Sequence, residues 1–234
     1  MVNLAFWQLR RHDERVTFNE AVRSRSLEAP RGVDELLALS NGADAAGTAV
    51  GTEVGTDLEW YLLSATGRYL PEEDLLLVNL SQDGRAGVDP IGALQLADGR
   101  ILIVNRGFIP LSEAVPSPPA GEVTVVGRVR ASQEHTRGAL GDSPTGELRE
   151  VQRIDLDRIA KQMPGTVIPV YIDLLQSEPA DSPILSRIAE PTLTLGPHLS
   201  YTVQWFVFSA CALVAWGFIV RRALAAARRA MPPA

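Results

Sequence analysis

The residues best suited to bind a ligand gather at the start of one long apolar run. His198 supplies an imidazole, which in its neutral form is a good metal ligand. In a helix, spacings of three, four and seven residues place Tyr201, Thr202 and Trp205 on one face with it. Polar side chains in or beside a membrane span are candidates for function. The alternative is that His198 only caps the helix or forms a hydrogen bond at the interface.

Gln204 lies farther into the same run. An amide is costly in a hydrocarbon environment unless it is hydrogen-bonded, so we expect its partner on another helix of the protein or of a neighbour. Trp7 and Arg10, near the other end of the chain, are of the types that anchor a helix at a membrane interface.

Asn105, Arg106 and Gly107 form a second polar group, directly after the apolar segment 101–104. Gly107 permits a backbone turn, and we expect Arg106 to pair locally. This assigns the three residues a structural role. The alternative is that Arg106 binds a partner.

Several function classes are disfavoured by motif and by charge. The sequence has no HExxH, no GxSxG and no phosphate-binding Gly-Lys-Ser/Thr loop, and its one cysteine, Cys211, excludes an internal disulfide. Four arginines after Val220 carry +4 of the formal net charge of −6, which leaves −10 on residues 1–220. Nucleic-acid phosphates need clustered Lys or Arg. We therefore predict a protein that is not an enzyme and does not bind nucleic acid.

The run from Leu199 to Val220 contains no charged residue. About 20 mostly apolar residues in a helix cross a bilayer core. Trp216 and Phe218, like the rings near His198, lie toward an end of the run, where aromatic side chains prefer the interface. The alternative is a buried core helix, but a soluble helix of this length usually shows a polar stripe. We predict a transmembrane helix over residues 198–222 and a location in the cell membrane.

The charges beside this run predict its orientation. Arg221 and Arg222 follow it directly, whereas the nearest charge before it is Glu190. Positively charged flanks stay in the cytoplasm. We therefore expect a basic cytoplasmic tail over residues 223–234, an extracytoplasmic domain over 26–197, and His198 at the outer membrane face.

Residues 1–25 read as an amphipathic helix that begins abruptly. Phe6, Trp7 and Leu9 stand beside Arg10 and Arg11, as at the end of a membrane helix that leaves lipid. We expect this stretch to be the exit of a first transmembrane span that is missing here. The alternative is an ordinary amphipathic helix. About 20 apolar codons in frame upstream of the first codon would settle the matter.

The segment from 26 to 197 alternates short apolar runs with turn residues every 8–15 positions, a pattern typical of an antiparallel sheet. Asp98-Gly99 is a signal for a tight hairpin. We expect strands over residues 60–70, 74–80, 93–96, 101–110, 122–130 and 167–175. We expect a turn over 81–87, loops over 41–55 and 132–150, and short helices over 33–39 and 155–163, the last capped by Asp155.

Pro169 interrupts the last of these strands, which suits an edge position or a bulge. The predicted fold class is α+β and membrane-anchored. It comprises a mainly antiparallel, barrel-like β-rich extracytoplasmic domain with short helices, followed by a C-terminal transmembrane helix.

Three segments in this order resemble the surfeit-locus-protein-one family of cytochrome c oxidase assembly factors, in its bacterial form. They are Trp7-Gln8-Leu9-Arg10, the run from Asn105 to Pro110, and the run from His198 to Phe206. Gly67-Arg68-Tyr69 and Gly127-Arg128 fit the same order, and the likeness covers roughly Trp7 to Arg222. The family has two spans around an extracytoplasmic domain, so the sequence departs from it at the front.

The resemblance implies a chaperone-like role in respiratory chain biogenesis, in the assembly of an aa3-type cytochrome c oxidase. It implies binding of haem a and help with its insertion into the catalytic subunit, with haem a synthase as a further candidate partner. His198 matches a histidine that has been proposed to hold haem a in bacterial members, and a neutral imidazole suits haem iron. The alternative is a membrane-tethered scaffold that stabilises an oxidase intermediate and binds no haem.

Overall fold

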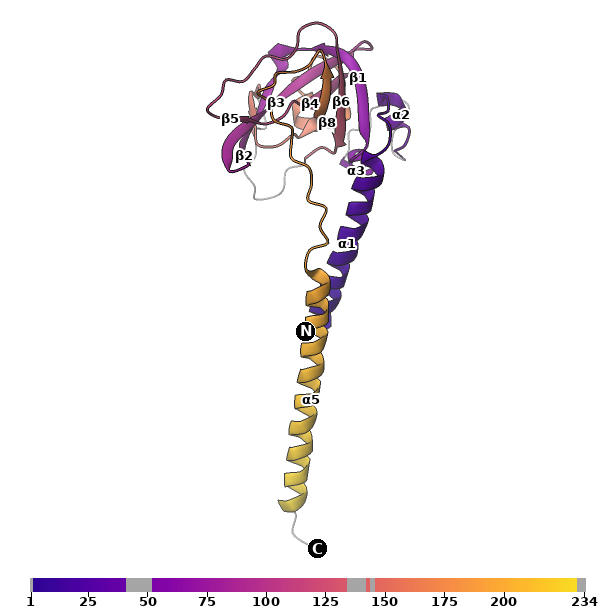
Figure 1. Cartoon of the computed structure of the whole chain (residues 1–234), viewed down its shortest axis with the longest axis vertical. Coiled ribbons are helices and arrows are strands. Elements are labelled where there is room, and N and C mark those ends of the chain that lie inside the picture. Colours follow the sequence, from indigo (N-terminus) through magenta and orange to yellow (C-terminus); the bar gives the residue numbers. More distant parts are fainter. Residues whose placement is uncertain (1, 41–51, 134–141, 144–145, 231–234) are drawn as a thin grey trace. The chain divides into compact units, whose positions relative to one another are not determined.

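The computed structural model describes residues 2–40, 52–133, 142–143 and 146–230 (Figure 1). The chain divides into two compact units. One is Val22–Pro191, here called the sheet unit, and the other joins Met1–Ala21 to Thr192–Ala234, here called the helical unit. Every strand of the described residues belongs to the sheet unit.

The sheet unit holds one sheet of eight strands. In spatial order the strands run β1-β6-β8-β4-β3-β2-β7, and β5 pairs with β3. Six of the eight strand pairings are antiparallel, and β4–β8 and β2–β7 are parallel. The strands are β1 (Leu62–Tyr69), β2 (Leu75–Gln82), β3 (Arg85–Leu96), β4 (Ile101–Asn105), β5 (Ile109–Pro110), β6 (Val123–Arg130), β7 (Glu150–Val151) and β8 (Val167–Glu178).

An additional pairing between β1 and β3 closes five strands into a ring, so the barrel-like prediction is confirmed. The closing contact pairs Gly67 with Leu96 and Tyr69 with Leu94. Gly67 is needed there, because a Cβ at this position would collide with the main chain of Gln95. Ring closure gives the β1 edge a partner along this contact.

β4 is buried on both faces, which explains why it reads as a continuous apolar run. Leu102 and Val104 belong to a hydrophobic cluster that also includes residues of α2 (Val33–Leu37) and α3 (Thr52–Leu58). Ile101 and Ile103 belong to a second cluster, which includes α4 (Leu156–Ala160). Burying each of these side chains stabilises the fold by about 1.5–3 kcal/mol.

The short helices cover the ring. α2 contacts β1, α3 contacts β6 and β8, and α4 contacts β8. Asp155 caps α4 as predicted, since its side chain accepts a hydrogen bond from the Arg158 main-chain N–H. One 3-10 turn, η1 (Pro71–Glu73), joins β1 to β2.

The structure decides between two alternatives for one local prediction and shows that two other local predictions were wrong. β8 contains Pro169 but lies in the middle of the sheet, between β6 and β4. The bulge reading was the right one, because the β4–β8 register shifts between Ile101 and Ile103, opposite this proline. The predicted turn over 81–87 is shorter, because β2 continues to Gln82 and β3 begins at Arg85. The expected loop over 41–55 includes part of α3, and its residues 41–51 lie outside the described residues.

The helical unit contains the start of α1 (Val2–Ser26) and all of α5 (His198–Ala230). α5 continues past residue 222, where the predicted span ends. Among the described residues it is the one helix long and apolar enough to cross a membrane, and none of its most apolar window is buried. Cys211 is exposed on it.

Candidate functional site

The His198 ring is held by α1. His198 Nδ1 lies 2.8 Å from Gln8 Oε1, and both residues belong to the helical unit. An amide oxygen only accepts hydrogen bonds, so this contact fits the tautomer with the proton on Nδ1. Thr202 is buried, and its hydroxyl donates to the His198 carbonyl oxygen at 2.9 Å. Gln8 therefore holds the His198 ring, and Thr202 holds its main-chain carbonyl group at the start of α5.

The other side of the His198 ring lies close to Gly196. A Cβ at Gly196 would come within 3.3 Å of both Nε2 and Cδ2 of His198. In the tautomer that Gln8 favours, Nε2 carries a lone pair. A ring nitrogen oriented in this way by a hydrogen bond at its partner nitrogen is the usual arrangement of a metal-ligating histidine. His198 Nε2 is therefore a candidate metal ligand.

The residues of the predicted α5 face differ in how deeply they are buried. Trp205 is half-buried like His198 and meets Phe208 edge-on, with ring centroids 6.0 Å apart. Tyr201 is 45% exposed, so it is less buried than His198 and Trp205. Gln204 is exposed too, and its amide has no hydrogen-bond partner among the described residues.

α1 packs on the first turns of α5 through a small contact. Ala5 is fully buried, and the rings of Phe6 and Phe206 meet at right angles 5.7 Å apart. Trp7 is 46% exposed, and Arg10 lies exposed on the rim of an open groove along α1. Of the predicted site residues in this unit, only His198 receives a polar side-chain contact from α1.

Asn105, Arg106 and Gly107 lie in the sheet unit and form a second, separate group. Arg106 is 3% exposed and makes a bidentate ion pair with Asp181, with Nε–Oδ2 2.8 Å and Nη2–Oδ1 2.7 Å. Its Nη1 donates to the Pro116 carbonyl oxygen. The expectation of local pairing was wrong, because Asp181 is 75 residues away in the sequence.

Asn105 ties three strands together. Its Nδ2 donates to Asp89 Oδ2 on β3 at 3.0 Å and lies 3.4 Å from Asp173 Oδ1 on β8. Its Oδ1 accepts from the Gly107 main-chain N–H, and Gly107 has φ +123°, a value that favours glycine. Burial raises the pKa of Asp89 to about 7 and also raises the pKa of Asp173.

Two further groups beside Arg106 lack hydrogen-bond partners in the described part of the chain. They are the Tyr69 hydroxyl and Asp74 Oδ1, both buried atoms. Burial raises the pKa of the Tyr69 phenol, and it raises the pKa of Asp74 to about 6. Opposite charge from Arg106 partly offsets both shifts.

Sequence reasoning named the central residues of both groups but missed their partners. Gln8 stands within the Trp7–Arg10 motif, which was a usable signal. Asp89, Asp173 and Asp181 are ordinary carboxylates in sequence, and only the pairing of strands far apart in the chain shows their role. Among the described residues, no group of three or more His, Cys, Asp or Glu side chains is placed to hold a metal ion.

Comparison with known proteins agrees with these motifs. A profile of the SURF1 family matches residues 1–210. Uncharacterized SURF1-like proteins of Mycobacterium bovis and Mycobacterium tuberculosis are each 25% identical over 231 residues, which cover 97% of this chain and 80% of the relative. A SURF1-like protein of Monosiga brevicollis is 28% identical over 184 residues, or 70% of this chain and 68% of the relative.

The family match spans most of the chain, including all three motifs that carry the resemblance. The resemblance to the surfeit-locus-protein-one family is thereby confirmed. The chain belongs to the SURF1 family, which is associated with the assembly of cytochrome oxidase.

Proposed function

We propose that this protein is a membrane-anchored assembly factor that carries haem a to the catalytic subunit of an aa3-type cytochrome c oxidase. The observation that carries the proposal is the His198–Gln8 contact at 2.8 Å, which engages Nδ1 and leaves Nε2 without a hydrogen bond among the described residues. Family membership supports a role in oxidase assembly, and the orientation of the His198 ring supports binding of the haem.

Haem a is the cargo in this proposal, and its iron accepts an axial nitrogen ligand. Nε2 of His198 provides that ligand, while Gln8 holds the ring in one orientation. Tyr201, three residues after His198 and on the same helix face, is 45% exposed, and Leu199 and Val203 are 53% and 58% exposed on another face of the same turns. These side chains offer apolar surface along which a flat macrocycle can lie. One axial ligand suits a cargo that must later be released.

The proposed membrane placement rests on α5. Its apolar window has no buried residue, so without lipid its side chains would face water. Arg221 and Arg222 follow the window and favour a cytoplasmic C-terminus. The sheet unit and His198 would then lie on the outer side of the cell membrane. The catalytic subunit is the proposed receiver and haem a synthase the proposed source.

The experiment is the optical spectrum of the full-length protein, purified in detergent from cells that make haem a. We expect a Soret band in the wild type that is lost in His198→Ala. His12→Ala is the matched control, because His12 lies on α1 and pairs with its neighbour Asp13. A colourless wild type, or a band unchanged in His198→Ala, would exclude the haem-carrier function. The remaining reading would then be a membrane-tethered scaffold for an oxidase intermediate.

A further inference from the structure

β8 loses one of its two neighbours before it ends. From Tyr171 to Asp173 it pairs with both β4 and β6, but its pairing with β4 ends at Asp173. From Leu174 to Glu178 it pairs with β6 alone. Within the described ranges, no strand pairs with the other side of this segment. Main-chain N–H and C=O groups on that side are therefore available to a further strand.

The chain that follows β8 turns back but is held away from this edge. Asp181 is fixed by its two hydrogen bonds from Arg106. Ser186 exchanges two main-chain hydrogen bonds with Phe108, at 2.7 and 2.8 Å, just before β5. The returning segment is thus bound to the β4–β5 connection. It forms a fixed wall opposite the end of β8.

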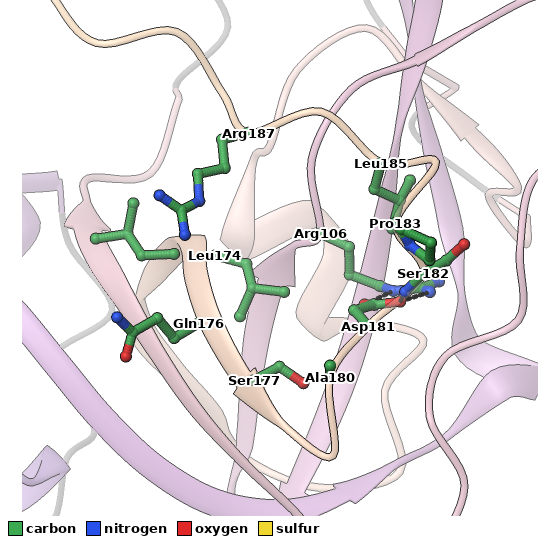
Figure 2. Close-up of a pocket in the computed structure, with 11 residues that line it drawn as sticks. Arg106, Leu174, Gln176, Ser177, Ala180, Asp181, Ser182, Pro183, Leu185 and Arg187 are labelled. Carbon is green, nitrogen blue, oxygen red and sulfur yellow. Dashed lines mark hydrogen bonds and ion pairs between the residues drawn. The ribbon is translucent and has the colours of Figure 1, made fainter.

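Between this wall and β8 lies an opening of about 470 Å³, shown in Figure 2 and here called the β8 groove. Its size falls in the range of sites that take a specific ligand. One side offers the main chain and side chains of residues 174–177, and the other offers residues 180–187. Leu174, Leu175 and Leu185 make part of the lining apolar.

The charge of the β8 groove is not balanced. Arg106 reaches it but is neutralised by Asp181. Arg187 is exposed at the other end, where Figure 2 shows its guanidinium directed into the opening. Its side chain has no ion-pair partner among the described residues. The occupant that fits is extended, partly apolar and negatively charged where it meets Arg187.

We infer that the β8 groove binds an extended acidic segment of a partner protein by strand addition. The segment would hydrogen-bond along residues 174–178 and place a carboxylate on Arg187. Main-chain pairing gives affinity in such complexes, and the side-chain contacts give specificity. This inference is independent of haem binding, because the groove lies wholly within the sheet unit and His198 does not.

The test uses the full chain in detergent micelles and a set of capped heptapeptides of alternating valine and threonine. One residue in each is replaced by glutamate, lysine or glutamine, at each position in turn. Fluorescence anisotropy measures binding, and hydrogen exchange locates it. We expect a glutamate peptide to bind at least tenfold more tightly than its lysine and glutamine counterparts. It should slow amide exchange in residues 174–178.

Two controls separate strand addition from loose attraction. Arg187→Glu should weaken binding of the glutamate peptide at least tenfold and strengthen binding of the lysine peptide. Arg68→Glu should change neither affinity, because Arg68 is exposed on β1 and does not line the groove. A glutamate peptide N-methylated at successive main-chain nitrogens should not bind, because it cannot form the strand hydrogen bonds.

Several results would overturn the inference. These are no binding by any glutamate peptide, equal binding of glutamate and lysine peptides, or binding that survives N-methylation. Protection that maps outside residues 174–178 would do the same. Concentration-dependent protection of 174–178 without peptide would show that a second copy of the chain, not another protein, occupies the groove.

Discussion

The two polar groups of this chain are satisfied in opposite ways. In the sheet unit, Asn105 and Arg106 donate hydrogen bonds to carboxylates and a carbonyl oxygen of the same chain. Both residues are buried. In the helical unit, Gln8 holds one ring nitrogen of His198, the other ring nitrogen has no hydrogen bond within the described part of the chain, and Gln204 is exposed. The first group stabilises a fold, whereas the second is where we propose that the chain binds a ligand or a partner.

This difference separates two kinds of motif that look alike in a sequence. Both are short polar runs beside apolar ones, and both carry the family resemblance. A buried polar group must find its partner within the chain, because leaving it unpaired costs about 1–3 kcal/mol. An exposed polar group at the end of an apolar helix is under no such demand. Burial therefore distinguishes a structural motif from a candidate binding motif.

The largest expected loss of folding stability comes from breaking the buried ion pair between Arg106 and Asp181. Arg106→Ala leaves Asp181 without its cation, and breaking a buried pair costs roughly 3–5 kcal/mol. We expect denaturant unfolding of the full chain, followed by circular dichroism, to show a loss of that size. The control is Arg100→Ala, whose pairs with Asp34 and Asp98 are solvent-exposed and worth at most about 1 kcal/mol. Equal losses would contradict a structural role for Arg106.

The second prediction concerns pH and Asp89, whose pKa is about 7 in the folded protein. The folded state prefers the neutral carboxyl. The contribution of Asp89 to the free energy of unfolding is therefore complete below about pH 4, where the carboxyl is also protonated in the unfolded state. The contribution falls as pH rises to about 7, because only the unfolded state ionises in that window. Asp89→Asn removes this loss, so we expect it to gain up to about 4 kcal/mol relative to wild type between pH 4 and pH 8.

Unfolding free energy measured across that pH range tests this prediction. Asp83→Asn, in the exposed turn between β2 and β3, is the control and should follow the wild-type profile. A parallel profile for Asp89→Asn would show that Asp89 is ionised in the fold.

The third prediction separates two costs of replacing a glycine by alanine, which are backbone strain at positive φ and collision of the new Cβ with neighbouring atoms. Gly107→Ala places a Cβ 2.6 Å from the Ser186 carbonyl oxygen and also strains the backbone at φ +123°. Gly99→Ala at φ +87° meets nothing within 4 Å, so only the strain remains. We expect a loss of about 1–3 kcal/mol at Gly107 and about 1 kcal/mol at Gly99. Thermal unfolding compares the two, and a larger loss at Gly99 would argue against the Ser186 contact.

The smallest effect on folding stability is expected for a change in the helical unit. Gln8→Leu removes the acceptor that orients His198, and losing such a supporting hydrogen bond typically weakens metal binding about 10–100-fold. Haem a titration, read by absorbance, measures this. Unfolding of the sheet unit should change by less than about 0.5 kcal/mol. A Gln8→Leu protein with unaltered haem affinity would leave His198 without its proposed support.

The sequence supported correct prediction where the pattern is local. Alternating apolar runs located the strands, Asp155 capped α4, and the uncharged run from Leu199 located α5. Pro169 predicted an edge or a bulge, and the sequence could not decide between them, because a bulge lets a proline stand in a central strand. The partner of Arg106 could not be predicted, because Asp181 reaches it only after ring closure and a return of the chain. Partners set by topology leave no periodic signal.

The most direct measurement is the haem a absorbance of membranes from cells whose only copy of the gene encodes His198→Ala. The variant protein should be present at the wild-type level, because His198 contributes little to the buried core. We predict that the aa3-type oxidase signal falls to that of a gene deletion. An oxidase signal equal to wild type, at equal amounts of the variant protein, would contradict delivery of haem a through His198.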